Sequence, residues 1–498
     1  MKRYVCLIAM QIAIIFYSYS QYDNVWMMGH YINPSFPKGK IEFSNGVPDT
    51  FSIFRTMPFY RTNASICDQS GNVLFYTNGV YIANRNHDTL ENSVNFNPGY
   101  YTNLNPSGIG YGYSAIIIPN PDDSAQYYVF HKTADTIIYQ GVPRQVSISL
   151  RYSEVDMMLD NGLGGITTGR KSINIVSDTL NRGLLMACKH GNGRDWWVLV
   201  PSFNDSLIYK VLVTPDTMIV SSQVTGSQIY YDVSGSSIFS PDGSKYVLMT
   251  QNNLLDIFDF DRCNGILSNH SVVHLPDTIY AYYGAAISAD NRYLYVNTQT
   301  EIYQLDLTSN PYSSSIIQVA QWDTAYLPFQ TYFGLNQLGP DGKIYIATTN
   351  GCHILHIIEQ PDSGGLACNV LQNTFTLAGP GGNSSVPAFP NYSLGPLTGS
   401  ACDTLTTIPP PPEKISNFKI YPNPVTNNIL NIGYQLPYNK SGTFKIYDVT
   451  GKVVFKYTLP QWSTLQKLNI KNISAGIYFC TITSNGYTVT KKLVICGN

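Results

Sequence analysis

The sequence predicts an all-β protein: a six- or seven-bladed β-propeller followed by a small immunoglobulin-like β-sandwich. The first observation is a hairpin pattern that returns at steps of 47, 48 and 51 residues between Asp195 and Asp341. The second is a set of seven short strand patterns in the last 84 residues, behind a run of prolines. Repeats of about fifty residues with four short strands each are typical of propeller blades, and seven strands in a small module are typical of a sandwich.

The composition narrows the class of protein. Of the 498 residues, 12% are charged and 13% are aromatic, and the chain contains 38 Tyr and 42 Asn. An average globular chain has about 25% charged residues. Disordered chains are rich in charge and poor in aromatic residues, so the composition of this chain excludes intrinsic disorder. With a net charge of −2 the chain has no positive field that would attract a polyanion, so we expect no nucleic-acid partner.

Residues 1–20 have the three regions of a signal peptide. Lys2 and Arg3 precede an apolar run over 4–17, and small polar residues lead to a cleavage site that we place after Ser20. The apolar run is shorter than the roughly 20 residues of a transmembrane helix. We therefore expect export to the periplasm and no transmembrane span in the mature chain.

Residues 21–405 contain the predicted propeller. Each repeat has a short apolar strand, a tight turn of Asp, Gly or Asn, and an aromatic-rich alternating strand. The six instances lie at 65–76, 115–130, 185–199, 237–249, 286–296 and 335–346. The longer step from Asp123 to Asp195 predicts an insertion over 132–180. A seventh blade, which we favour, would combine 25–32 and 40–53 with a strand near 375–377 and so close the ring with both chain ends.

Residues 406–414 form a predicted linker and 415–498 the predicted sandwich. The linker contains four consecutive prolines, which remove backbone donors and keep the chain extended. Strands are expected at 418–421, 429–434, 443–447, 452–459, 466–470, 476–483 and 487–495.

Eight cysteines remain after removal of the signal peptide, and their wide spacing excludes a CxxC motif. An even number in an exported chain suggests disulfides. Cys352 with Cys368 and Cys480 with Cys496 are the preferred pairs, and the alternative is that several are buried thiols.

Four ordered motifs run through the C-terminal module. They contain Tyr421, Pro422, Asn423 and Pro424; Asp448, Gly451 and Lys452; Gly476 and Tyr478; and Lys491 and Lys492. Together they resemble the type A C-terminal sorting domain of the type IX secretion system (Por secretion) of Bacteroidetes. The resemblance implies recognition by the outer-membrane machinery, cleavage by its sortase, and release or attachment at the cell surface. The tail from Cys496 to Asn498 departs from that pattern.

Further stretches at 68–79, 151–157, 189–197 and 389–392 resemble a secreted propeller family of the same bacteria. The resemblance implies the architecture alone, because that family has no established activity. The Gly-His and Trp-Asp pairs that recur in WD repeats do not recur from repeat to repeat in this chain.

Linear motifs for chemistry are sparse. The chain has no HExxH, GxSxG or P-loop, and its six Glu are scattered. His353 and His356 would face opposite sides of a strand, and Asp256, Asp259 and Asp261 read better as turn caps than as calcium ligands. We expect no metal site and no cofactor.

The hairpin over 189–197 is the candidate binding site, with His190, Asp195, Trp196 and Trp197 as its residues. Adjacent residues of a strand face opposite sides, so one tryptophan would lie in the core and the other could stack on a sugar or peptide.

We expect a secreted or surface-displayed propeller that binds a surface polysaccharide, another ligand or a protein, as a binding or adhesion module. The alternative is a secreted hydrolase or lyase with an active site at a channel mouth, and a third reading is a structural surface component. Three or more convergent buried ionisable groups at a channel mouth would favour the enzyme, and a ring of amides and tyrosines would favour binding.

Overall fold

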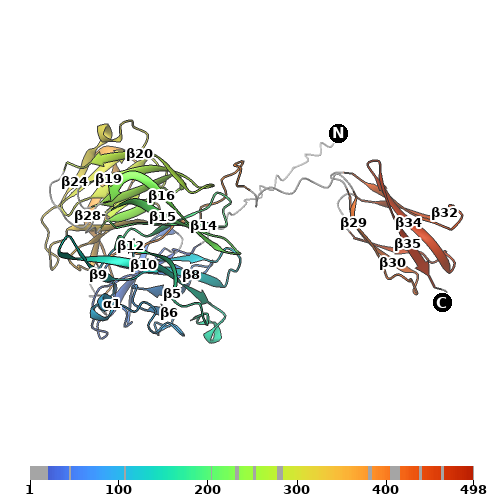
Figure 1. Cartoon of the computed structure of the whole chain (residues 1–498), viewed down its shortest axis with the longest axis horizontal. Coiled ribbons are helices and arrows are strands. Elements are labelled where there is room, and N and C mark those ends of the chain that lie inside the picture. The colour runs from blue at the N-terminus through green and yellow to red at the C-terminus, as the bar shows by residue number, and fades with distance from the viewer. Residues whose placement is uncertain are drawn as a thin grey trace, which may run out of the picture. The chain divides into compact units, whose positions relative to one another are not determined.

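The computed structural model describes residues 21–496 apart from 44–45, 106–107, 204, 230–234, 251–253, 277–283, 380–383, 404–414, 437–439 and 461–464. The predicted signal peptide and the predicted linker 406–414 lie outside the described residues. The chain divides into two compact units, 1–403 and 404–498 (Figure 1).

The first unit contains seven antiparallel sheets that follow one another along the described chain. The first two have three strands: β1 (Val25–Met27), β2 (Lys38–Glu42) and β3 (Asp49–Ile53); then β4 (Ala64–Cys67), β5 (Val73–Thr77) and β6 (Ile82–Asn84). The third has six: β7 (Ala115–Pro119), β8 (Gln126–Lys132), β9 (Asp135–Tyr139), β10 (Val142–Asp156), β11 (Gly165–Ile166) and β12 (Ile173–Leu180). The fourth and fifth have four each: β13 (Met186–Lys189), β14 (Trp196–Pro201), β15 (Asp205–Val213) and β16 (Met218–Ile229); then β17 (Ser236–Phe239), β18 (Lys245–Thr250), β19 (Leu254–Asp261) and β20 (Ile266–His274). The last two also have four each: β21 (Gly284–Ile287), β22 (Tyr293–Asn297), β23 (Glu301–Asp306) and β24 (Ile317–Gln321); then β25 (Phe333–Leu338), β26 (Ile344–Thr348), β27 (Ile354–Ile358) and β28 (Val370–Thr376).

These sheets are the blades of a propeller. The first strand of each sheet contacts the first strand of the next from β1 to β25, so these seven strands line the centre of the ring. Strands such as β14, β22 and β26 are buried along their whole length, because a neighbouring blade covers each of their faces. The prediction of a propeller is confirmed, with seven blades in the described residues. Helical structure is confined there to α1 (Tyr100–Leu104) and a few short 3₁₀ turns.

The recurrent hairpin turn has a local cause. Between β17 and β18, the Ser240 hydroxyl donates to Asp242 Oδ1 at 2.6 Å, and the same oxygen accepts the Ser244 N–H at 2.9 Å. Gly243 has a φ of 74°, which side chains other than glycine rarely adopt. The Asp and Gly of the repeat therefore reverse the chain where the pattern predicts.

Ring closure differs from the expectation. Residues 375–376 belong to β28, which pairs with β27, and β1–β3 form a sheet of their own. The first and last blades meet instead through side chains, with the Trp26 and Tyr345 rings 5.4 Å apart. The predicted insertion is the long strand β10 of the third blade, which pairs with β8, β9, β11 and β12.

The second unit is a two-sheet sandwich with the seven predicted strands. One sheet contains β29 (Ser416–Tyr421), β30 (Ile429–Gln435) and β33 (Leu465–Asn469), and the other contains β32 (Val453–Leu459), β31 (Gly442–Tyr447), β34 (Gly476–Ser484) and β35 (Tyr487–Ile495) in that order. Leu430 and Ile432 from the first sheet and Phe444 and Ile446 from the second share one core. Among the described residues, no helix has the length and apolar character needed to cross a bilayer.

Candidate functional site

The predicted binding hairpin is the turn between β13 and β14. Its polar side chains already form hydrogen bonds within the protein. Asn192 Nδ2 donates to Asp195 Oδ2 at 2.8 Å, and Arg194 Nε donates to Asp195 Oδ1 at 2.7 Å. His190 Nδ1 accepts the Asn192 N–H at 3.1 Å, so Nε2 carries the proton and donates to the Cys263 carbonyl at 2.9 Å. Both ring nitrogens of His190 are therefore occupied.

The expectation of an exposed tryptophan is wrong. Trp196 is 1% exposed and packs on Tyr392, with ring centroids 6.0 Å apart. Trp197 is 5% exposed, and its Nε1 donates to the Arg262 carbonyl at 2.9 Å. Both faces of β14 are covered, so neither tryptophan ring offers a stacking surface.

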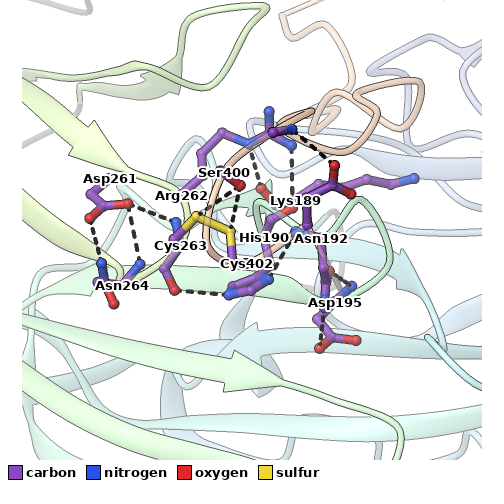
Figure 2. Close-up of a disulfide and its surroundings, with 12 residues drawn as sticks. Lys189, His190, Asn192, Asp195, Asp261, Arg262, Cys263, Asn264, Ser400 and Cys402 are labelled. Carbon is purple, nitrogen blue, oxygen red and sulfur yellow. Dashed lines mark hydrogen bonds between the residues drawn. A yellow bond between two sulfur atoms is a disulfide. The ribbon is translucent and has the colours of Figure 1, made fainter. Parts of the chain in front are cut away.

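This hairpin is instead a structural junction, held by a disulfide between Cys263 and Cys402 (Figure 2). Arg262 lies beside the bridge, and its guanidinium donates to the carbonyls of Lys189, His190 and Gly395. The Leu397 N–H donates to the Gly191 carbonyl at 2.7 Å. The junction ties residues 395–402, at the end of the first unit, to the fourth and fifth blades.

The preferred disulfide pairs are therefore wrong. Cys352, Cys368, Cys480 and Cys496 are free thiols. The first three are buried, as in the alternative reading, and the pair that forms joins residues 139 positions apart.

Residues 384–394, here called the central segment, run through the middle of the ring. The Ala388 N–H donates to the Asn63 carbonyl, just before β4 begins, and Asn391 Nδ2 donates to the Pro241 carbonyl, just after β17 ends. The Tyr392 hydroxyl donates to the carbonyl of Ile117, midway along β7, at 2.8 Å. The segment thus contacts the beginning of one inner strand, the middle of a second and the end of a third.

A cavity of about 270 Å³ remains beside the central segment. Its walls are the inner strands β13, β17, β21 and β25, with Phe389, Pro390 and Asn391 on the remaining side. Most lining side chains are apolar, such as Met186, Ile238 and Ala285. Small-molecule sites have this character: apolar walls and a few well-placed polar groups.

Asn336 is the main polar group of the cavity wall. It is 1% exposed, and both its Oδ1 and its Nδ2 lack a hydrogen-bond partner among the described residues. Its amide lies against Gly284 on the neighbouring inner strand, where a Cβ would clash with Oδ1. An unsatisfied buried amide costs about 1–3 kcal/mol, so a retained one calls for a partner.

Other polar groups of the wall already have partners. Ser240 donates to Asp242, and Gln337 Oε1 accepts the Phe389 N–H. Asp23 is the one carboxyl among the lining residues, and removal from water raises its pKa to about 6. Burial raises the pKa of the Cys188 thiol to about 12, so that thiol stays protonated.

Sequence reasoning missed Asp23 and Asn336, although one signal was available. Asn336 and Gln337 interrupt an inner strand that is otherwise apolar, whereas the equivalent strand over 284–287 carries only Gly, Ala and Ile.

The remaining polar candidates have structural roles. Asp256 accepts from His270, Asp259 from Lys245, and Asp261 from the N–H groups of the turn that follows it. His356 is buried and bonded to the Thr331 carbonyl. In the part of the chain that the structure describes, no three His, Cys, Asp or Glu side chains are grouped to hold a metal ion.

Comparison with known proteins identifies the C-terminal unit. Residues 419–496 match the family described as the secretion system C-terminal sorting domain. Most of the motif residues are exposed, at turns and on the edge strand β35, whereas Tyr478 is buried in the core of the sandwich. Asn423 Nδ2 donates to the Lys492 carbonyl, and Asp448 Oδ1 accepts the N–H groups of Thr450 and Lys452. The chain thus carries a type IX sorting domain, which implies contact with the export machinery and a destination at the outer surface or beyond it.

No curated protein matches the chain. Solved structures with a similar arrangement include the periplasmic gluconolactonase of Pseudomonas aeruginosa, at 12% identity and a TM-score of 0.38, over 72% of this chain and 97% of that one. Another is apo AztD of Citrobacter koseri, at 11% identity and a TM-score of 0.37, over 73% of this chain and 96% of that one.

Proposed function

We propose that the exported protein is a binding module that takes a small, uncharged, polar ligand into the cavity beside the central segment. The observation that carries the proposal is the Asn336 amide, buried in the cavity wall with its donor and its acceptor both unpaired. A ligand hydroxyl or amide that both donates and accepts would satisfy it after a rotation of the Asn336 side chain, because both amide atoms are covered in the structure. The cavity of about 270 Å³ lies just below the usual range for drug-sized ligands, so a molecule of monosaccharide size is the class it fits.

Two features support binding over hydrolysis. The described lining residues include a single carboxyl, Asp23, whereas paired acid–base catalysis needs two groups with separated pKa values. The central segment also occupies the space where several blades would otherwise present side chains to one reacting centre.

Replacing Asn336 by Leu tests the proposal, because it separates binding from folding. The change removes the unpaired amide at similar volume, so the free energy of unfolding should rise by about 1 kcal/mol, while ligand affinity should fall at least about tenfold. Neutral monosaccharides at millimolar concentration are the probes, with binding measured by calorimetry and thermal shift on the mature chain.

Asn297→Leu is the matched control. Asn297 is buried outside the cavity, and its Nδ2 donates to the carbonyls of Thr298 and Gly334. This variant should lose stability and keep its affinity for the probe. If wild-type protein binds none of the neutral sugars, or if Asn336→Leu binds them as wild type does, the proposal fails.

A further inference from the structure

The two units carry opposite charge, which the net charge of the whole chain conceals. Residues 415–498 contain nine lysines and one aspartate, with no arginine and no glutamate, which is a formal charge of +8. Residues 21–403 contain 18 basic and 30 acidic residues. The sandwich is therefore a strongly cationic module on an anionic protein.

Several of these charges gather on the outer face of one sheet. On β31, Phe444 and Ile446 lie in the core, so Lys445 and Tyr447 point outward. Lys445 is directly opposite Lys456 of β32, and Tyr447 is opposite Phe479 of β34. Residues opposite one another share a face, so these four side chains form one surface, here called the basic face.

The lysine pair costs stability within the sandwich. Like charges directly opposite each other on a sheet repel. Asp448, the one acidic residue of the sandwich, is engaged by the N–H groups of its own turn. No ion pair to Lys445 or Lys456 occurs in the described part of the chain.

Protection of sheet edges does not explain the pair. Lysines on edge strands prevent pairing with other chains, and this accounts for Lys456 on β32. Lys445, however, lies on β31, between β32 and β34, where no edge is exposed. Phe479 is 44% exposed beside it, an apolar ring that solubility alone would not place there.

We infer that the basic face is a docking surface for a protein whose own surface is acidic around an apolar pocket. Carboxylates of the partner would neutralise Lys445 and Lys456, and the pocket would take the Phe479 ring. Lysines raise the rate of association with an anionic surface, and a central aromatic side chain contributes most of the affinity in protein interfaces. A phosphate-rich glycan would satisfy the charges and leave Phe479 without a role. Because the module is a sorting domain, the docking step belongs to export.

The test compares export of full-length variants in a bacterium with type IX secretion. Lys445→Gln/Lys456→Gln should lower the secreted fraction at least about tenfold and leave the chain in the periplasm. Phe479→Ser, which changes no charge, should also lower it. Lys467→Gln/Lys471→Gln removes the same charge from other exposed positions and should be secreted like wild type.

Two further measurements keep the outcome interpretable. Thermal unfolding of the purified proteins should show the Lys445/Lys456 variant at least as stable as wild type, because a repulsive pair has been removed. Retention on polyphosphate-coated resin distinguishes a protein partner from a polyanion. If Phe479→Ser is exported normally and the Lys445/Lys456 variant is no longer retained on the resin, the partner is a polyanion and the proposal is overturned. Wild-type export of the Lys445/Lys456 variant, or an equal loss in the Lys467/Lys471 control, would also overturn it.

Discussion

At the scale of single residues, polar side chains inside the ring decide what the centre can do. Asn336 leaves a donor and an acceptor unpaired, and Asp23 adds a carboxyl that is easily protonated. Elsewhere, buried charges are satisfied by the backbone: Lys132 donates to the carbonyls of Asn181 and Gly183, and burial holds its pKa well below its usual range. Other buried polar atoms also lack a partner, such as both ring nitrogens of His131, and Asn336 differs from them because it lines the cavity.

Asp23 should make stability depend on pH. Its folded-state pKa is raised to about 6, so the folded chain holds the proton more tightly than the unfolded chain, and stability is lost as pH rises from about 4 to 6. Asp23→Asn should therefore raise the free energy of unfolding above pH 6 by up to about 3 kcal/mol and leave it unchanged near pH 4. Urea titrations at pH 4 and pH 7.5 measure this. Asp122→Asn, at an exposed turn, is the control and should show no such gain.

At the scale of elements, the central segment and the junction at 395–402 turn an open ring into a filled one. The segment has few regular strand or helix hydrogen bonds, so its sequence lacks the periodicity that predicted the blades. Its position depends on aromatic packing, with Phe389 against Trp26 and Tyr392 against Trp196.

Gly191 is the tightest point of the junction. A Cβ at this position would overlap Cys402 Sγ and approach Cys263 Sγ to 2.9 Å. Gly191→Ala should therefore prevent the bridge from closing, and thiol titration of denatured protein should find two more free thiols than in wild type. Gly395→Ala, where a Cβ meets nothing within 4 Å, should keep the wild-type thiol count. A wild-type count in Gly191→Ala would mean that the junction can shift without losing the bridge.

At the scale of the whole molecule, the disulfide closes a loop that contains the last strand of blade five, blades six and seven, and the central segment. Cross-linking a long loop lowers the entropy of the unfolded chain, typically by the equivalent of about 2–4 kcal/mol. Cys263→Ser/Cys402→Ser should lower the stability of the propeller by that amount and leave unfolding of the sandwich unchanged, because the bridge lies entirely in the first unit. Calorimetry of the mature chain can follow the two transitions. Equal shifts in both would contradict the independence of the units.

Blades and sandwich strands were predictable because their signals are local. A tight turn of Asp, Gly or Asn between alternating strands predicts a hairpin, and hairpins that recur about every fifty residues predict a ring. The sorting domain was recognisable for the same reason, since its motifs lie in order along the chain. The net charge of the whole chain did not reveal the basic face, because acidic residues of the first unit offset the lysines of the sandwich.

The sequence alone thus determined the two β units, the blade repeat and the export module. Only the tertiary structure decided which cysteines pair, that Trp196 and Trp197 are both buried, and that Asp23 and Asn336 line one cavity. Hydrogen-bonded hairpins form between residues close in sequence, whereas the disulfide, the central segment and the cavity join residues more than a hundred positions apart. Those contacts depend on how seven blades pack around a centre, which no local pattern records.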